Sequence, residues 1–262
     1  MITKRRFLRA SAVTAGIGLG LGLYTWRVEP HWVEVVERPL QVANLPEHLA
    51  GTRLVQLSDL HIGPRVDDAY LLRVFDRVKE LAPEIVVYTG DFTSYEADGF
   101  AHAIRMFAHL PVGSRATFGI PENHDYGPGW AHPDIAEIIT ALACDVGVRV
   151  LRNEVAQVDG LQVVGFDDLW AHRFEPVGPL AALDPGRASL VLSHNPDTAD
   201  QPGWGTTRAG FWPVTHMAVS ASLRSCPHPC SLLPTVATRV ESFRCPEAAR
   251  CTSIGGSVTL CE

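Results

Sequence analysis

From Thr52 onward, short apolar runs alternate with a segment whose apolar residues recur at helical spacing. The runs are rich in β-branched residues and have the length of buried strands. Between the first two, Asp67 or Asp68 can cap a helix. This order predicts an α/β fold whose first strands pair in parallel. The predicted strands are Thr52–Ser58, Glu84–Thr89, Arg115–Ile120 and Ala188–Ser193, and the apolar positions of the first helix are Leu71, Val74, Phe75, Val78 and Leu81.

Two further signals refine this expectation. Pro133 to Ala143 has the pattern of a helix that begins with proline. The dipeptide Asp159-Gly160 stands between two apolar runs, 155–158 and 161–166, and is a strong hairpin signal. The hairpin adds an antiparallel pair, so we expect a second sheet of mixed direction.

Polar side chains follow four of the predicted strands, at the point where each strand ends. The four clusters are Ser58-Asp59-Leu60-His61, Gly90-Asp91, Asn123-His124-Asp125 and His194-Asn195-Pro196-Asp197. Taken singly, Asp-x-His or Gly-Asp is more often a turn than a ligand set. However, loops at the carboxyl ends of strands in an α/β sheet converge on one crevice. Their shared position after apolar runs therefore favours one common site.

The types of side chain in these clusters indicate a metal. Ca and Mg take oxygen ligands almost alone, whereas Mn, Fe and Zn also accept imidazole. A site built from carboxylates, imidazoles and an amide therefore predicts Mn, Fe or Zn.

Composition limits the partners of the chain. The 262 residues carry a net charge of −7, and 46% of them are hydrophobic, which suffices for one sizeable core. No cluster of Lys and Arg occurs beyond the first nine residues, so polymeric nucleic acid is not an expected partner.

The N-terminal 28 residues have the pattern of a targeting segment. Four basic residues, Lys4, Arg5, Arg6 and Arg9, precede the uncharged stretch Ala10–Trp26. The segment resembles a twin-arginine export signal, with Lys4-Arg5 in place of the arginine pair. An ordinary N-terminal membrane anchor is the alternative, since no clear Ala-x-Ala cleavage site follows. Either interpretation places the folded part outside the cytoplasm.

The motifs together resemble those of the calcineurin-like metallophosphoesterases, in particular the bacterial branch that is exported or membrane-anchored. The resemblance covers residues 29–204. It implies a four-layer α/β/β/α sandwich that holds two divalent metal ions at the strand ends. The motifs that carry it are Leu57-Ser58-Asp59-Leu60-His61, Thr89-Gly90-Asp91, Asn123-His124-Asp125-Tyr126-Gly127, Gly165-Phe166-Asp167-Asp168 and Ser193-His194-Asn195-Pro196-Asp197.

The resemblance also implies a role for each matching residue. Asp59 and His61 would bind the first metal, and Asp91 would bridge the two. Asn123 and His194 would bind the second metal. His124 would be the catalytic histidine near the leaving group, and Asp125 would orient its imidazole. Two such ions can activate a hydroxide for attack on phosphorus.

One departure from the family pattern lies beside these residues. The family has glycine before Asn-His, whereas this chain has Glu122. Glycine suits a tight turn that other residues resist, and a carboxylate here can bind a metal, crowd it or displace Asn123.

A larger departure concerns residues 205–262. The family closes its site with Gly-His-Thr-His, and no such sequence follows His194. Five of the six cysteines lie between Cys226 and Glu262, without hydrophobic periodicity. Three interpretations compete: a cysteine-rich module around Cys226-Pro227-His228-Pro229-Cys230, a divergent ending, and an out-of-frame tail. The first matches no standard zinc spacing.

The genetic code tests the third interpretation. If each new codon begins at the third base of an old one, residues 209–221 allow Trp-Ile-Leu-Ala-Gly-His-Thr-His-Gly-Gly-Gln-Cys. The same shift from Phe243 to Leu260 allows a string similar to the closing strands of the family. We therefore predict a single-base insertion or deletion between about Trp204 and Ala209, either in the gene or in its sequencing. The C-terminal part of the second sheet would then be missing or disordered.

The sequence thus predicts a metal-dependent phosphoesterase at the outer face of the inner membrane, attached through its N-terminus. A small phosphoester, lipid-linked or nucleotide-like, fits that location as substrate. The alternative is an impaired or inactive remnant that lacks the Gly-His-Thr-His ligands.

Overall fold

The computed structural model describes residues 4–27, 33–64, 66–94, 100–204, 210–213 and 218–226. The chain divides into two compact units, Met1–Val35 and Val36–Glu262. Among the described residues, the first unit contains one helix, and the second contains both sheets and the clusters that follow their strands.

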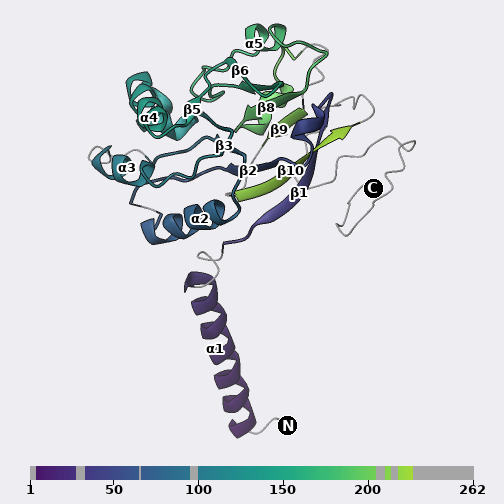
Figure 1. Ribbon diagram of the computed structural model, residues 1–262. Coiled ribbons are helices and arrows are strands. Elements are labelled where there is room, and N and C mark those ends of the chain that lie inside the picture. Colours follow the sequence, from purple (N-terminus) through teal and green to yellow (C-terminus); the bar gives the residue numbers. More distant parts are fainter. Residues whose placement is uncertain are drawn as a thin grey trace. The chain divides into compact units, whose positions relative to one another are not determined.

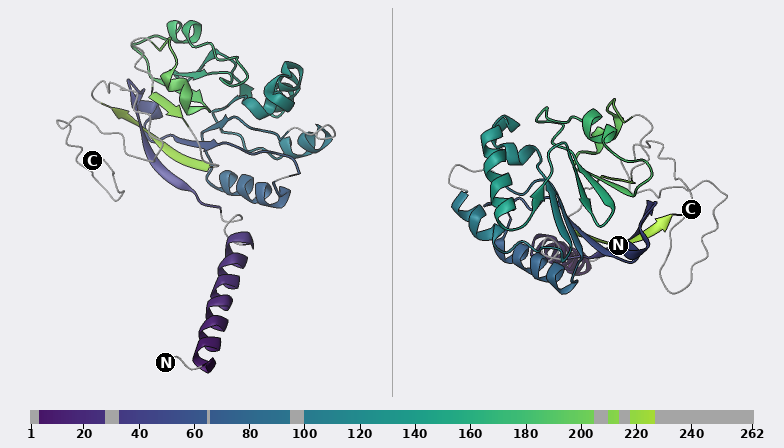
Figure 2. Two further views of the ribbon diagram at one scale, coloured as in Figure 1. Left: turned by 180° about the vertical axis from the view of Figure 1, so that it is seen from behind. Right: turned by 45° about the horizontal axis from the view of Figure 1, so that its top comes forward.

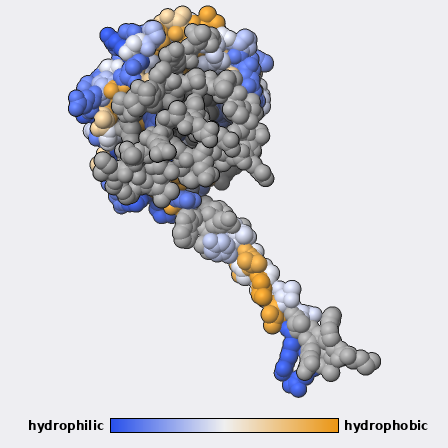
Figure 3. Space-filling model, turned by 90° about the vertical axis from the view of Figure 1, so that its right-hand side faces the viewer, coloured by the Kyte–Doolittle hydropathy of each residue, from blue (hydrophilic) through white to orange (hydrophobic). Residues whose placement is uncertain are grey.

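Helix α1 (Lys4–Arg27) forms the described part of the first unit. Figure 3 shows apolar side chains along this helix and polar ones at its N-terminal end. The exposed apolar residues are Val13, Ile17, Leu19, Leu21, Leu23 and Tyr24. Among the helices of the described segments, none is both long and apolar enough to cross a membrane. The export signal or anchor stays a prediction.

The first sheet contains six strands in the order β1-β10-β2-β3-β4-β5 (Figure 1). The four strands β2, β3, β4 and β5 pair in parallel, which confirms the expected parallel start. Strand β10 is parallel to β1 and antiparallel to β2. The bounds are β1 Val36–Ala43, β2 Arg53–Leu57, β3 Ile85–Thr89, β4 Ala116–Ile120, β5 Arg149–Val150 and β10 Ala218–Cys226.

The second sheet has the order β6-β7-β8-β9, with bounds Glu154–Val158, Leu161–Gly165, Ser189–Ser193 and Gly210–Pro213. Strands β6 and β7 form the predicted antiparallel hairpin, and β8 and β9 continue in parallel. Asp159 and Gly160 have φ angles of 50° and 92°, as a tight hairpin turn of this type requires. The sheet is therefore mixed, as the sequence predicts.

The two sheets pack face to face, with helices on their outer faces (Figures 1 and 2). Alternate residues of strand β7 point to opposite faces of the second sheet. Val163 belongs to the core between the sheets, whereas Val164 packs with Leu180 of α5 (Val177–Ala181). Helices α2 (Asp68–Glu80) and α3 (Phe100–Phe107) cover the first sheet. The result is the four-layer α/β/β/α sandwich.

The predicted helices form where the sequence places their caps. Asp67 accepts a hydrogen bond from the backbone N–H of Ala69 and begins α2, with Asp68 at the positive end of the helix dipole. Helix α4 (Pro133–Asp145) begins at the predicted proline. Strands β1 and β5 and helices α3 and α5 are not among the predicted elements, because Glu37, Arg38 and Pro39 interrupt the apolar residues of β1 and the other three elements are short.

The C-terminal tail is described only in part. Strand β9 continues the second sheet, so the expected loss of that sheet does not extend to Gly210–Pro213. Strand β10 likewise places residues of the tail in the first sheet. The remaining tail residues, 205–209, 214–217 and 227–262, lie outside the described residues. They include Val214-Thr215-His216-Met217, whose codons contribute to Gly-His-Thr-His in the shifted frame, and most of the cysteine-rich segment.

Candidate metal centre

The loops after β2 and β3 are joined by backbone hydrogen bonds and carry three of the predicted ligands. The N–H of Asp59 donates to the carbonyl of Gly90 at 3.2 Å, and the N–H of His61 donates to that of Asp91 at 2.9 Å. All three predicted ligands have positive φ: 56° at Asp59, 44° at His61 and 54° at Asp91. Non-glycine residues adopt this region at a cost, and such conformations cluster at functional sites.

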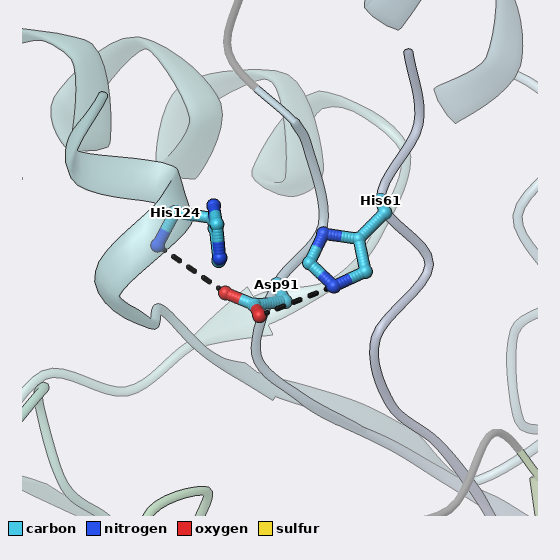
Figure 4. Close-up of side chains that lie close together, drawn as sticks. All are labelled: His61, Asp91 and His124. Atoms are coloured by element: carbon cyan, nitrogen blue, oxygen red, sulfur yellow. Dashed lines mark hydrogen bonds and ion pairs between the residues drawn. The ribbon is translucent and has the colours of Figure 1, made fainter. Parts of the chain in front are cut away.

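Asp91 lies at the centre of the site (Figure 4). One carboxylate oxygen is 3.4 Å from Nε2 of His61, and the other accepts a hydrogen bond of 3.3 Å from the backbone N–H of His124. Within the described segments, two groups of possible metal ligands share this residue: His61, Asp91 and His124, and Asp59, Asp91 and His194. In each group the ligand atoms lie within 4.8 Å of one another. A carboxylate common to two groups has the position that a bridging ligand needs.

His194 approaches the same centre from the second sheet. Its Nδ1 lies 2.7 Å from the carbonyl oxygen of Thr89, the last residue of β3. This contact requires the proton on Nδ1, which leaves the lone pair of Nε2 free for a metal. Nε2 lies 3.9 Å from a carboxylate oxygen of Asp59. The end of β8 therefore delivers an imidazole in the tautomer that a metal ligand needs.

Asn123 begins the short helix η3 (Asn123–Tyr126), which follows β4. Its side-chain oxygen Oδ1 is buried and has no hydrogen-bond partner within the described part of the chain. A buried amide oxygen without a partner is costly unless something else satisfies it. A metal ion beside Asp91 would do so, and this orphan oxygen shows that the side chains present fit such an ion.

Asp125 is fully buried and accepts hydrogen bonds from the backbone N–H groups of Thr93 at 3.0 Å, Glu122 at 3.1 Å and Phe92 at 3.3 Å. These bonds connect η3 to the loop after β3. Burial raises the pKa of Asp125 to about 7, although the three N–H groups act in the opposite direction. That Asp125 also orients His124 stays a prediction.

Glu122 occupies the position where the family has glycine, and the structure accommodates it. Its φ of −139° and ψ of 177° are ordinary extended values, so glycine is not required there. The side chain packs instead on Gly90, whose φ is +91°. It accepts a hydrogen bond from the backbone N–H of Asn123. The expected steric conflict is therefore absent from the turn itself.

The Glu122 carboxyl pairs with that of Asp168, in the loop after β7. Burial and the hydrogen bond to Asp168 raise the pKa of Glu122 to about 11, so the two carboxyls share a proton at neutral pH. The motif Gly165-Phe166-Asp167-Asp168 carries part of the family resemblance, but the sequence assigned no role to its aspartates. Only the structure shows that Asp168 lies behind a predicted ligand loop.

A second buried network involves Asp167. Arg152 donates to the Asp167 carboxylate and to the Tyr126 hydroxyl, both at 2.8 Å, and Tyr126 donates to Asp167. Tyr126 is the last residue of η3, so this network fixes the turn that carries Asn123 and His124. Residues so far apart in sequence gave no periodic signal from which this contact could be predicted.

The electrostatics of the centre favour a cation. Burial, followed by repulsion from Asp125 and Asp59, raises the pKa of Asp91 to about 8. Buried carboxylates that repel one another are stabilised in the ionised form when a cation binds between them. All seven predicted site residues lie on the η3 turn or on the loops at the ends of β2, β3 and β8. They are Asp59, His61, Asp91, Asn123, His124, Asp125 and His194.

The fold and site together define a metallohydrolase of the α/β sandwich class. The calcineurin-like phosphoesterase family model matches residues 52–213. The UDP-2,3-diacylglucosamine pyrophosphatase LpxG of Chlamydia trachomatis is 27% identical over 239 positions, which cover 71% of this chain and 72% of that protein. The uncharacterized metallophosphoesterase YkuE of Bacillus subtilis is 29% identical over 215 positions, which cover 76% of this chain and 71% of that protein. The phosphodiesterase YaeI of Escherichia coli is 27% identical over 208 positions, covering 76% and 72%.

The chain belongs to the calcineurin-like phosphoesterase family. Its domain is that of a hydrolase that acts on phosphoester bonds.

Proposed function

We propose that this domain hydrolyses a small phosphoester at a centre that holds two divalent metal ions, with Mn, Fe or Zn as the metal. The observation that carries the proposal is the pair of ligand groups that share Asp91. Two such ions would supply activation of a water molecule and neutralisation of the phosphate oxygens. The orphan oxygen of Asn123 and the tautomer of His194 support the same assignment.

The roles of the individual residues are those that the family motifs imply. By position, Asp59 lies near both His61 and His194, at 3.8 and 3.9 Å, and His124 groups with His61 and Asp91. Asp59 and His61 would hold one ion, Asn123 and His194 the other, and Asp91 both. His124 is partly exposed, and its ring lies 5.0 Å from that of His61, edge to face. In this position the imidazole, if protonated, would donate to the leaving alkoxide or to a phosphate oxygen.

The register of β9 supports an out-of-frame tail. Ser193 pairs with Pro213, so β8 and β9 end at the same edge of the sheet, which carries His194. In the shifted frame, the codons from Pro213 to Met217 allow Gly-His-Thr-His. The missing ligands would thus follow β9 directly, and the family match also ends at Pro213. We therefore place a single-base insertion or deletion between about Trp204 and Ala209.

The N-terminal unit bears on where the enzyme acts. Helix α1 combines basic residues at its start with exposed apolar residues along its length. We propose that it is an export signal or anchor, and that the domain works at the outer face of the inner membrane. A lipid-linked substrate is compatible with that location, and the relative LpxG is named as a pyrophosphatase of the diacylated compound UDP-2,3-diacylglucosamine.

Hydrolysis of bis-p-nitrophenyl phosphate with added Mn²⁺ tests both parts of the proposal. The frame-corrected chain is the product of the gene with the reading frame restored after Trp204, and the printed chain is the 262-residue sequence itself. We expect the frame-corrected chain to be active and to lose activity on Asp91→Ala. We expect the printed chain to be inactive or strongly impaired. Inactivity of both chains would contradict the proposed hydrolysis. Activity of the printed chain that Asp91→Ala abolishes would refute the account of the tail and exclude the alternative of an inactive remnant.

A further inference from the structure

Two tryptophans stack on the surface of the phosphoesterase domain. The rings of Trp130 and Trp170 lie 5.6 Å apart with an interplanar angle of 19°. Trp130 is 41% exposed and Trp170 is 47% exposed. Both residues are therefore partly buried and partly exposed. Part of each indole is in contact with solvent. That part of the ring does not contribute to the packing of the core.

The backbone holds Trp130 in a specific and unusual position. Gly127, Gly129 and Trp130 have φ angles of 70°, 65° and 59°. For a bulky aromatic residue such a φ is a true outlier. The turn is closed by a 3.0 Å hydrogen bond from the N–H of Trp130 to the carbonyl of Gly127. A strained residue that the surrounding turn fixes in this way points to a function.

The turn that carries Trp170 is also closed by hydrogen bonds. Asp168 accepts from the backbone N–H of Ala171 through its side chain, and from that of Arg173 through its carbonyl at 2.9 Å. The N–H of His172 donates to the carbonyl of Leu169 at 3.1 Å. Hydrogen bonds thus hold the loop that carries Trp170 in place, and the two rings are stacked without a bound ligand.

Both turns begin at the metal centre. Trp130 comes six residues after His124, across the kinked pair of short 3₁₀ helices η3 and η4 (Pro128–Trp130), so the chain between them spans at most about 20 Å. Trp170 comes two residues after Asp168, whose carboxyl pairs with Glu122 beside Asn123. The stack therefore lies within reach of a substrate whose phosphate is at the centre.

We propose that Trp130 and Trp170 form a subsite for a planar ring of the substrate, and that the substrate is a phosphoester of a nucleoside. Parallel indoles offer an outer π-face, and stacking of a base on an aromatic side chain is largely independent of the base. The inference rests on the proposed function only in that the phosphate group of the substrate binds at the metal centre. The net charge of −7 makes an anionic membrane surface a weaker occupant of the same two rings.

Binding measurements can test the subsite without hydrolysis. Titration calorimetry on the full chain with Mn²⁺ compares uridine monophosphate with ribose 5-phosphate, which lacks only the base. We expect the base to strengthen binding by about 5- to 150-fold. Trp130→Leu and Trp170→Leu should remove most of that difference, Trp130→Phe should keep much of it, and the exposed control Val177→Ala should keep all of it.

Several results would overturn the subsite. One is an equal affinity of the unaltered chain for the two ligands. Another is an equal loss of affinity for both ligands in the leucine variants, since that would indicate a structural role. Loss of binding to anionic phospholipid vesicles, with nucleotide affinity unchanged, would assign the pair to a membrane instead. A base-dependent difference in an inactive chain would keep the subsite and count only against the proposed hydrolysis.

Discussion

Gly90 and Glu122 are in such close contact that no side chain can be added at position 90. A Cβ atom there would lie 2.5 Å from Cβ of Glu122 and 3.2 Å from Nδ1 of His194. Position 90 directly precedes the central ligand Asp91. The glycine therefore does more than permit a positive φ, because its missing side chain leaves room for both Glu122 and a proposed metal ligand.

Gly90→Ala should lower both stability and metal affinity, and Gly51→Ala provides the matched control. Gly51 has a φ of +84°, close to the +91° of Gly90, but nothing lies within 4 Å of its missing Cβ. Gly51→Ala should thus cost only the backbone strain of about 1–2 kcal/mol. Gly90→Ala should cost about 1–3 kcal/mol more through overpacking. Chemical denaturation and Mn²⁺ titration measure the two effects, and equal losses in both variants would show that the contact with Glu122 is unimportant.

Glu122→Gln should be nearly neutral, whereas Glu122→Ala should not. The carboxyls of Glu122 and Asp168 share a proton at pH 7, and the Glu122 side chain accepts from the N–H of Asn123. Glutamine can make both bonds, but alanine leaves Asp168 buried without this partner. We expect a loss of about 1–3 kcal/mol for alanine and less than about 1 kcal/mol for glutamine, measured by urea unfolding. A large loss for glutamine would mean that the carboxyl itself is required.

The sequence predicts the parallel start, the hairpin and the first helix because each depends on local signals. Alternating apolar runs, the Asp159-Gly160 turn and the Asp67 cap act within a few residues. The grouping of Asp59 with Asp91 could also be predicted, since the ends of neighbouring parallel strands share one edge, whereas His194 of the second sheet is placed beside them by the family motifs. The Glu122–Asp168 pair and the Trp130–Trp170 stack could not, because both join loops from different sheets whose register no local pattern specifies.

The metal-free protein should lose stability as the pH rises from about 4 to 8. Asp91 and Asp125 have folded pKa values of about 8 and about 7, above their ordinary value of 3.8. In this window the folded state binds more protons than the unfolded state, so unfolding becomes easier with each rise in pH. Glu122, with a pKa of about 11, extends the decline to higher pH.

Thermal unfolding in a chelator at pH 5, 6, 7 and 8 measures this decline, and Asp91→Asn should make it shallower. A midpoint that rises over the same range would contradict the assignment. Mn²⁺ should reverse part of the decline, because metal binding requires ionised Asp91 and releases its proton.

Asn123→Ala should remove one metal ion, whereas Asn195→Ala should not. Both asparagines are buried and follow a strand. Asn123 is the first residue of the 3₁₀ helix η3, and Asn195 is the N-cap of the 3₁₀ helix η5 (Pro196–Asp200). The side-chain oxygen of Asn195 already accepts a 2.9 Å hydrogen bond from the N–H of Asp197, whereas that of Asn123 has no partner among the described residues. Loss of the Asn195 cap should therefore cost about 0.5–2 kcal/mol without a change in metal content.

Elemental analysis of the frame-corrected chain, with denaturation in parallel, separates the two effects. We expect the metal content of Asn123→Ala to fall by about one ion per chain, since the remaining imidazole of His194 and the shared Asp91 hold the second ion less tightly. Unchanged metal content in Asn123→Ala would remove Asn123 from the ligand set. Its buried oxygen would then need another partner.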